Sequence, residues 1–316
     1  MQWKRLGKIF DPESVHLMPG QCGFAQSPQA LIRDDFVRIF FSTRTRDATA
    51  TYLSQVAYVD FDKQFRKILN HSTAPVIPLG KLGTFDEHGI FPANIISVGT
   101  DVYAYTTGWS RRRSVPVDAA IGMAISKDGG QSFVKQGEGP VLGPSLHEPF
   151  LVGDGFVANF HGVFHMWYIH GTRWIKNSFG HPDRVYKIAH ATSTDGIVWQ
   201  RVCTGFIPDR LGSDECQALP TVIELDGRYH MWFCYRYAVD FRNNPERSYR
   251  IGHAWSADLK NWHREDENAV LDVAPEGWDS EMVCYPNVFH CEQETYMLYN
   301  GNAFGKQGFG LARLEK

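Results

Sequence analysis

Acidic residues recur at a fixed distance from a proline, and this spacing is the first sign of chemistry in the chain. Glutamates stand five residues before a proline at three places, and an aspartate lies beside each: Glu87 with Asp86 before Pro92, Glu215 with Asp214 before Pro220, and Glu281 with Asp279 before Pro286. Carboxyl groups gathered at one place repel each other, and partial burial raises the pKa of at least one. The result is a proton donor beside an ionised base, as glycosidic bond cleavage requires.

Two further places in the chain correspond to these three. His147-Glu148-Pro149 supplies a fourth acid, whereas the segment from Gly23 to Pro28 has none. An acid of this kind can instead cap a turn or pair with an arginine, and for any single residue this structural role is the better supported. A purely structural role for the acids of all four copies at once is less well supported. We therefore take Glu215, Glu148, Glu87, Glu281 and Asp86 as candidate catalytic residues.

The elements that must position these acids repeat five times. Each copy contains an aromatic-rich strand, at residues 38–44, 102–108, 165–171, 230–236 and 296–301, and the copies recur about every 64 residues. One such unit cannot bury both faces of its sheet, so neighbouring units must stack and the array must close. We predict one all-β domain over residues 1–316, a five-bladed β-propeller of four-stranded antiparallel blades. Its innermost strands would converge on an axial funnel.

The fourth copy shows the expected strands most clearly. Residues 219–225 read as an inner strand, Asp226-Gly227 as a hairpin turn, 229–235 and 249–256 as the next strands, and Trp262 as part of a short outer strand. Aspartates after the third strands (Asp128, Asp195 and Asp258) read as turn formers without catalytic roles. The fifth copy ends after its third strand. We expect Trp3 to Phe10 to supply its outer strand and so cover an exposed edge.

Large polar and aromatic side chains stand where the aromatic-rich strands end, which we expect to be the same end of the propeller as the acids. Aromatic faces can stack on sugars, and arginine, histidine or asparagine can hold hydroxyl or anionic groups. The arginines can also simply neutralise the acids, or they can bind a phosphate, a nucleotide diphosphate or a sugar acid. The candidate binding residues are Gln26, Arg44, His88, Trp109, Arg111, His147, His170, Arg173, Trp174, Asp214, Tyr235, Arg236, Asp279 and Asn300.

Composition narrows the possible partners. The net charge of −3 does not indicate the basic surface that nucleic acid binding needs. No apolar run is long enough to cross a membrane. The N-terminus lacks a secretory signal, and the six cysteines form no CxxC pair, so we expect free thiols in the cytosol. The pattern requires no metal and no cofactor. The expected partner is a small sugar, glycoside or sugar phosphate, and the sequence leaves the oligomeric state open.

The repeated Tyr/His-Met-Trp-Tyr strands, the Ser-x-Asp-Gly-x-x-Trp turns and the segments Gly277–Met282 and Tyr299–Asn302 resemble the five-bladed β-propeller glycosidase superfamily. This superfamily includes invertases, arabinanases, xylosidases and mannoside phosphorylases. The resemblance covers nearly the whole chain and implies a propeller fold and action on sugars. Glu215-Cys216 is similar to the Glu-Cys acid/base of the invertase-like pattern, and Glu148 is similar to its transition-state stabiliser.

The chain departs from that pattern at the nucleophile position, which holds Gln26 or Ser27 in place of a carboxylate. Phosphorylase-like relatives need fewer acids, because phosphate itself attacks. The resemblance as a whole implies an enzyme of the glycoside hydrolase type, in which Glu215 is the first choice for the general acid. Two alternatives stay open: a phosphorylase or transferase acting on a phosphate- or nucleotide-bearing sugar, and a catalytically inactive sugar-binding propeller.

Overall fold

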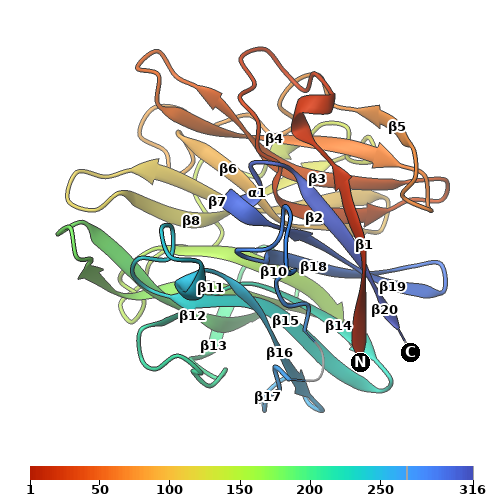
Figure 1. Cartoon of the computed structure of the whole chain (residues 1–316). Coiled ribbons are helices and arrows are strands. Elements are labelled where there is room, and N and C mark those ends of the chain that lie inside the picture. The colour runs from red at the N-terminus through yellow and green to blue at the C-terminus, as the bar shows by residue number, and fades with distance from the viewer. Residues whose placement is uncertain (268–269, 316) are drawn as a thin grey trace.

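The computed structural model describes residues 1–267 and 270–315, which are almost entirely strands and connecting loops (Figure 1). Within these residues no helix has the length and apolar character needed to cross a bilayer. The described helical segments are single turns: η1 (Pro12–Ser14), η2 (Pro245–Arg247) and α1 (Asn302–Gly305). The chain is therefore all-β, as its sequence predicts.

The described strands form four sheets, in which neighbouring strands are antiparallel except for one parallel pair. The largest sheet has the order β2 (Gln26–Ile32), β3 (Val37–Arg46), β4 (Tyr52–Phe61), β6 (Gly89–Val98), β7 (Asp101–Arg111), β8 (Val117–Ser126), β9 (Val134–Lys135), with β5 (Ile68–His71) on β4. The second is β10 (Val152–Phe160), β11 (Val163–Lys176), β12 (Pro182–Ser193), β13 (Gln200–Thr204). The third is β14 (Glu215–Leu225), β15 (Arg228–Tyr237), β16 (Arg250–Ser256), β17 (His263–Arg264). The fourth is β18 (Cys284–Cys291), β19 (Glu294–Asn300), β20 (Phe309–Glu315), β1 (Gln2–Phe10).

The strands expected in the fourth copy are present, with two corrections. Asp226 and Gly227 both have positive φ, 51° and 73°, as the tight turn between β14 and β15 requires. Strand β14 begins at Glu215, not at Leu219, because pairing with β15 resumes on the far side of a bulge. Trp262 lies just before β17 and is buried, so it anchors this edge from the preceding turn.

The two ends of the chain lie in one sheet. Strand β1 pairs with β20, which confirms the expected pairing of the N-terminal strand, and both termini lie side by side in Figure 1. The first strands of the repeats also contact each other in cyclic order: β2 with β6, β6 with β10, β10 with β14, β14 with β18, and β18 with β2. Side-chain amides of the fourth sheet also bind the backbone of β2 in the first sheet. Asn287 Oδ1 accepts from Ala30 N at 2.9 Å, and Asn300 Oδ1 accepts from Ser27 N at 2.9 Å.

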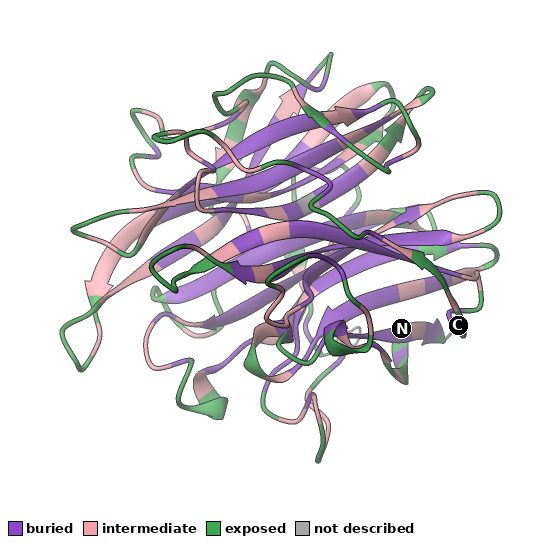
Figure 2. Cartoon of the chain, turned by 90° about the horizontal axis from the view of Figure 1, so that it is seen from above, coloured by how far each residue is buried: buried purple, intermediate pink, exposed green. Residues whose placement is uncertain are grey.

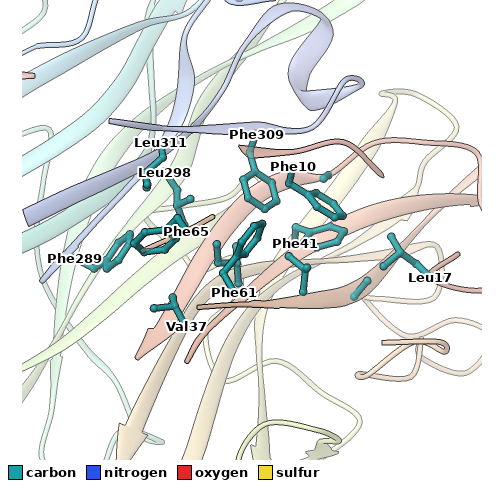
Figure 3. Close-up of a cluster of buried hydrophobic side chains, with 14 of the residues drawn as sticks. Phe10, Leu17, Val37, Phe41, Phe61, Phe65, Phe289, Leu298, Phe309 and Leu311 are labelled. Atoms are coloured by element: carbon teal, nitrogen blue, oxygen red, sulfur yellow. The ribbon is translucent and has the colours of Figure 1, made fainter. Parts of the chain in front are cut away.

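An aromatic core fills the junction between the first and last sheets (Figure 3). The ring of Phe10 lies 5.1 Å from both Phe41 and Phe309, so β1, β3 and β20 share one packed cluster. Buried residues follow the strands throughout, and exposed residues gather in the loops (Figure 2). Burial of large rings is a major stabilising term in a fold of this kind, so this cluster helps to hold the two ends of the chain together.

Two sheets contain the same pair of adjacent histidines, and His190, His230 and His253 are buried whereas His165 is half-buried. His165 Nδ1 lies 3.0 Å from His190 Nε2, and His230 Nδ1 lies 3.0 Å from His253 Nε2. Burial, with a smaller contribution from the partner histidine, lowers the pKa of His190 to about 4 and that of His253 to about 4. Both pairs are therefore neutral in the folded chain at neutral pH.

These histidines predict a pH dependence of stability. An unfolded histidine takes up a proton near pH 6.5, whereas the folded ones resist it until about pH 4. Folding stability is thus fully present above about pH 6.5 and is lost as the pH falls toward 4. Thermal midpoints followed by circular dichroism should decrease over this range, and His253→Gln should flatten the decrease. The exposed His16 provides the control, because His16→Gln should leave the slope unchanged. A slope that His253→Gln does not alter would contradict this explanation.

Candidate active site

The first strand of each repeat is interrupted at the same place. Strand pairing shifts register between Gln26 and Gln29, Pro92 and Asn94, Gly153 and Phe156, Ala218 and Thr221, and Cys284 and Asn287. In four of these bulges one residue has positive φ: Ser27 (53°), Asp154 (52°), Leu219 (45°) and Tyr285 (59°). This conformation is uncommon for residues other than glycine, and bulges re-aim side chains. All four residues line one cavity.

The residue that follows the bulged position explains why the strand breaks there. It is Pro28, Pro220 or Pro286 in three copies, and proline has no N–H to donate to the ladder. In the copy with Asp154 it is Gly155, where an added Cβ would lie 2.9 Å from Ile121 Cδ1. The cavity residue thus stands directly before the proline or glycine, not five residues before it.

The cavity has a volume of about 420 Å³. Its described charged residues are one carboxylate and three guanidinium groups: Asp154, Arg44, Arg184 and Arg242. Aromatic rings make much of the remaining wall: Phe24, Tyr52, Phe91, Trp109, Tyr186, Tyr249 and Tyr285. Rings of this kind offer flat apolar faces, and the arginines offer donors for an anion.

Asp154 is the one acidic side chain among the described residues of the cavity wall, and the pKa of its carboxyl group is raised. Its backbone N–H donates to Thr107 Oγ1 at 2.7 Å, and the Thr107 hydroxyl lies 3.4 Å from Asp154 Oδ1. Burial raises the pKa of the Asp154 carboxyl to about 6, although Arg184, Thr107 and the backbone of Leu219 each act to lower it. A carboxyl group with a pKa near the working pH can donate a proton in one step and recover it in the next.

The arginines of the cavity differ in their surroundings. The Arg242 side chain is half exposed, and its Nη1 lies 3.5 Å from Asp183 Oδ1. Partial desolvation and then the nearby positive charge of Arg184 lower the pKa of Arg242. Arg44 donates to Gln26 Oε1 and Ser54 Oγ, which are both neutral. A cavity with this charge pattern is suited to an anionic group.

Two tyrosines of the cavity are backed by a buried arginine. The hydroxyls of Tyr186 and Tyr249 lie 2.6 Å apart, and Arg236 Nη2 donates to Tyr186 Oη at 2.9 Å. The Arg236 guanidinium lies 3.5 Å from the centre of the Phe241 ring and is 1% exposed. Arg236 therefore supports the cavity wall from behind and does not line the cavity as the sequence led us to expect.

The repeated acids occupy a different environment. In four repeats an acid that precedes or begins the first strand is buried and pairs with a basic side chain of the outermost strand: Asp86 with Lys135, Glu148 with Arg201 (2.7 Å), Glu215 with Arg264 (2.6 Å) and Asp279 with Arg5 (3.1 Å). Tyr168 also donates to Glu148, and Tyr299 to Asp279. The acids thus tie the entry of each repeat to its outer edge, which is the structural alternative noted above.

None of the four candidate glutamates is among the described residues that line the cavity. Glu215 is fully buried and accepts from the backbone N–H groups of Arg210 and Leu211 as well as from Arg264. Glu87 accepts from Gly83 N and lies 3.3 Å from His88 Nδ1, and Glu281 is exposed. The expectation that these glutamates share one cavity is therefore wrong, because they face the loops and outer strands.

Of the candidate binding residues, Arg44 and Trp109 line the cavity. Gln26 accepts a hydrogen bond from the cavity residue Arg44. Asn300 donates to Ala25 O and accepts from Ser27 N. The others have structural or surface positions. Arg111 pairs with Asp47, Arg173 with Asp214, and Tyr235 lies under Arg264; His170 is buried, Trp174 packs in an apolar cluster, and His147 is exposed.

Sequence reasoning missed Asp154, Arg184, Arg242, Tyr186, Tyr249 and Tyr285. The rule that the residue before the inner-strand proline lines the cavity would have found Tyr285, together with Ser27 and Leu219. The described residues contain no group of three or more histidine, cysteine, aspartate or glutamate side chains that could hold a metal ion. All six cysteines are free thiols.

Comparison with known proteins identifies relatives of the whole chain. No family model matches it. Two proteins from strains of Mycobacterium tuberculosis, Uncharacterized protein Rv1502 and Uncharacterized protein MT1551, are each 33% identical over 321 residues, which is 100% of this chain and 100% of each relative. This similarity is sufficient to define a family.

Solved structures show the same fold at much lower identity. A glycoside hydrolase superposes with a TM-score of 0.73 and 14% identity, covering 99% of this chain and 92% of that one. The β-1,2-mannobiose phosphorylase of Listeria innocua gives 0.70 and 14%, covering 100% and 97%. An endo-arabinase of Bacteroides thetaiotaomicron gives 0.65 and 13%, covering 98% of each chain. The fold is that of the propeller glycosidases and phosphorylases.

The buried pair of Glu215 and Arg264 predicts a loss of stability on substitution. Breaking a buried ion pair typically costs about 3–5 kcal/mol, and Arg264 keeps a second partner in Asp266 at 2.9 Å. We therefore expect Glu215→Gln to lower the free energy of unfolding by about 3 kcal/mol, at the low end of that range. Urea unfolding at neutral pH measures this. Glu294→Gln is the control, since the Glu294–Arg313 pair is exposed and 3.8 Å apart. Equal stability of Glu215→Gln and the wild type would exclude the structural role.

Proposed function

The chain belongs to the same family as the two mycobacterial proteins, and we propose that it is a carbohydrate-active enzyme that cleaves a glycosidic bond with phosphate. The cavity volume of about 420 Å³ lies in the range usual for small-molecule sites. Its aromatic rings suit sugar faces, and its arginines suit phosphate. The neighbours in fold include a glycoside hydrolase and a mannobiose phosphorylase, which agrees with a sugar as the partner.

We further propose that the strands form five blades around this cavity. The largest sheet is joined at its middle by a single parallel residue pair, Ser54 with Gly89, so it divides into two units of four strands. The cyclic contacts of β2, β6, β10, β14 and β18 favour the same arrangement. The bulged residues then face the axis from successive blades.

The observation that carries the proposed reaction is the single carboxylate among the described residues of the cavity wall. Hydrolysis of a glycoside usually needs two carboxyl groups, one as acid and one as base or nucleophile. Phosphorolysis needs one, because phosphate is itself the nucleophile. Asp154 supplies a carboxyl group with a raised pKa, Arg184 lies near it, and Arg242 lies near Arg184 in the wall of the same cavity.

The reaction balances with these groups. Phosphate held by Arg184 and Arg242 attacks the anomeric carbon, and the bond from this carbon to the bridging oxygen breaks. Asp154 donates its proton to the departing oxygen, which leaves as a hydroxyl group of the second sugar. The hydrogen phosphate then returns a proton to Asp154 as the sugar phosphate forms. In the reverse direction the same groups would build a glycoside from a sugar phosphate.

Hydrolysis with Glu215 as the acid is less well supported. A general acid must come within hydrogen-bond reach of the departing oxygen, about 2.6–3.2 Å. Glu215 is fully buried, and its carboxylate already accepts from Arg264, Gln217 and two backbone N–H groups. We therefore place the acid at Asp154, and the roles expected for Glu148, Glu87, Glu281 and Asp86 in catalysis are not part of the proposal.

Replacement of Asp154 tests the acid directly. We expect the wild type to release sugar phosphate from members of a disaccharide panel only when inorganic phosphate is present. Asp154→Asn should lower kcat/KM by roughly 10²–10⁴-fold, because the amide cannot donate the proton. Asp35→Asn, which changes an exposed aspartate, should have no effect. Turnover by Asp154→Asn at the wild-type rate, or turnover independent of phosphate, would contradict the proposal.

The raised pKa of Asp154 also predicts the pH profile. The acid must be protonated, so kcat/KM should fall as the pH rises above about 6. Thr107 lowers the pKa of Asp154 by hydrogen bonding, so Thr107→Val should move this descending limb to higher pH. Titration of phosphate itself would not move with this substitution. A limb at the same pH in both proteins would show that Asp154 does not cause it.

A further inference from the structure

Arg44 forms a separate positive wall of the cavity. It lies near the end of β3, where it donates to Gln26 Oε1 and Ser54 Oγ. The rings of Phe24 and Phe91 lie 5.6 Å and 5.1 Å from its guanidinium carbon. All of these neighbours are neutral, and no carboxylate of the described residues forms an ion pair with Arg44. A nearby acid, Asp47, pairs with Arg111 at 2.8 Å.

A cation in such a place is normally compensated. Burying a charge is costly unless it is paired, and burial lowers the pKa of Arg44 to about 10, which still leaves it charged at neutral pH. Arg44 lines the cavity, so a ligand that fills the cavity would lie beside it. The compensating anion can therefore come from the ligand.

Arg44 comes from a different part of the fold than the two arginines of the proposed reaction. It comes from β3, whereas Arg184 comes from β12 and Arg242 from the loop after β15. In the cyclic order of first strands, β6 stands between β2, which pairs with β3, and β10, whose sheet contains β12. Trp109 belongs to this intervening unit, and its Nε1 donates to Ser54 Oγ at 3.1 Å. Arg44 therefore belongs to a different repeat from both Arg184 and Arg242.

The charges lead to the same conclusion. Arg242 has the Asp183 carboxylate at 3.5 Å, and Arg184 and Arg242 hold the phosphate of the proposed reaction. The remaining charge is that of Arg44. We propose that the Arg44 wall is a second anion-binding position and that the sugar acted on carries its own acidic group, a phosphate or a carboxylate. The assignment of this group to a sugar rests on the proposed function, whereas the anion position does not.

Gln26 allows a test that leaves Arg44 in place. Because Gln26 Oε1 already accepts from Arg44, Gln26→Glu should place a carboxylate on the guanidinium and form an ion pair with little change of shape. The variant should unfold at or above the wild-type temperature, yet it should lose anion binding at this wall. Gln131→Glu adds the same charge in an exposed turn and is the control.

Calorimetric titration of the full-length chain with inorganic phosphate counts the positions. We expect two equivalents for the wild type and for Gln131→Glu, and one each for Gln26→Glu and Arg242→Gln, with the affinity at the altered position weakened at least about tenfold. If the wild type binds one equivalent of phosphate and only Arg242→Gln abolishes this binding, the Arg44 position is overturned and the phosphorolysis proposal stays intact. If the wild type binds one equivalent of phosphate and only Gln26→Glu abolishes this binding, the result supports the Arg44 position and contradicts phosphorolysis. No binding would overturn both.

Sugar acids then identify the group. Glucose 6-phosphate and glucuronate, titrated in the presence of phosphate, should compete for the position that Gln26→Glu removes, whereas glucose should not. Competition by the first alone indicates a phosphate group, and competition by the second indicates a carboxylate. Failure of both to compete would overturn the inference that a sugar carries the second anion.

Discussion

A break in the hydrogen-bond ladder of each first strand is the constraint on which the site depends. A regular strand would alternate its side chains between the two faces of the sheet. The bulge rotates one residue out of this alternation and gives it positive φ, as at Asp154 and Tyr285. Because the fold repeats, one local irregularity supplies a ring of side chains to one cavity. Different residues can occupy the bulge without altering the sheets around it.

The buried acids have the opposite role. Glu148, Glu215 and their counterparts hold the outer edge of each sheet to the strand entry, in contacts that leave little freedom to move. Because these carboxylates are neutralised by Lys135, Arg201, Arg264 and Arg5, they add no negative charge to the cavity. The cavity arginines then outnumber its single acid, and this imbalance favours phosphate over a second carboxylate as the attacking group.

The architecture was accessible from sequence because it is written in local signals that recur. The aromatic strands, the Asp226-Gly227 turn and the missing last strand led to β3, β7, β11, β15, β19 and to the β1–β20 pair. The site was less accessible, because spacing along a chain does not say which face of a bulged strand a residue takes. The recurring proline of the first strands is visible in the sequence, but its position does not tell whether Glu215 or Leu219 lines the cavity. Asp154 was missed since Gly155 replaces the proline, and Arg184 and Arg242 become neighbours only when separate sheets pack together.

The most direct test of the cavity as the site is a crystal structure of the chain soaked with phosphate and a sugar phosphate. The proposed arrangement predicts phosphate between Arg184 and Arg242, the sugar ring against Asp154 and Trp109, and its acidic group on Arg44. Ligands bound beside Glu215 or Glu148, with the cavity around Asp154 empty, would contradict it.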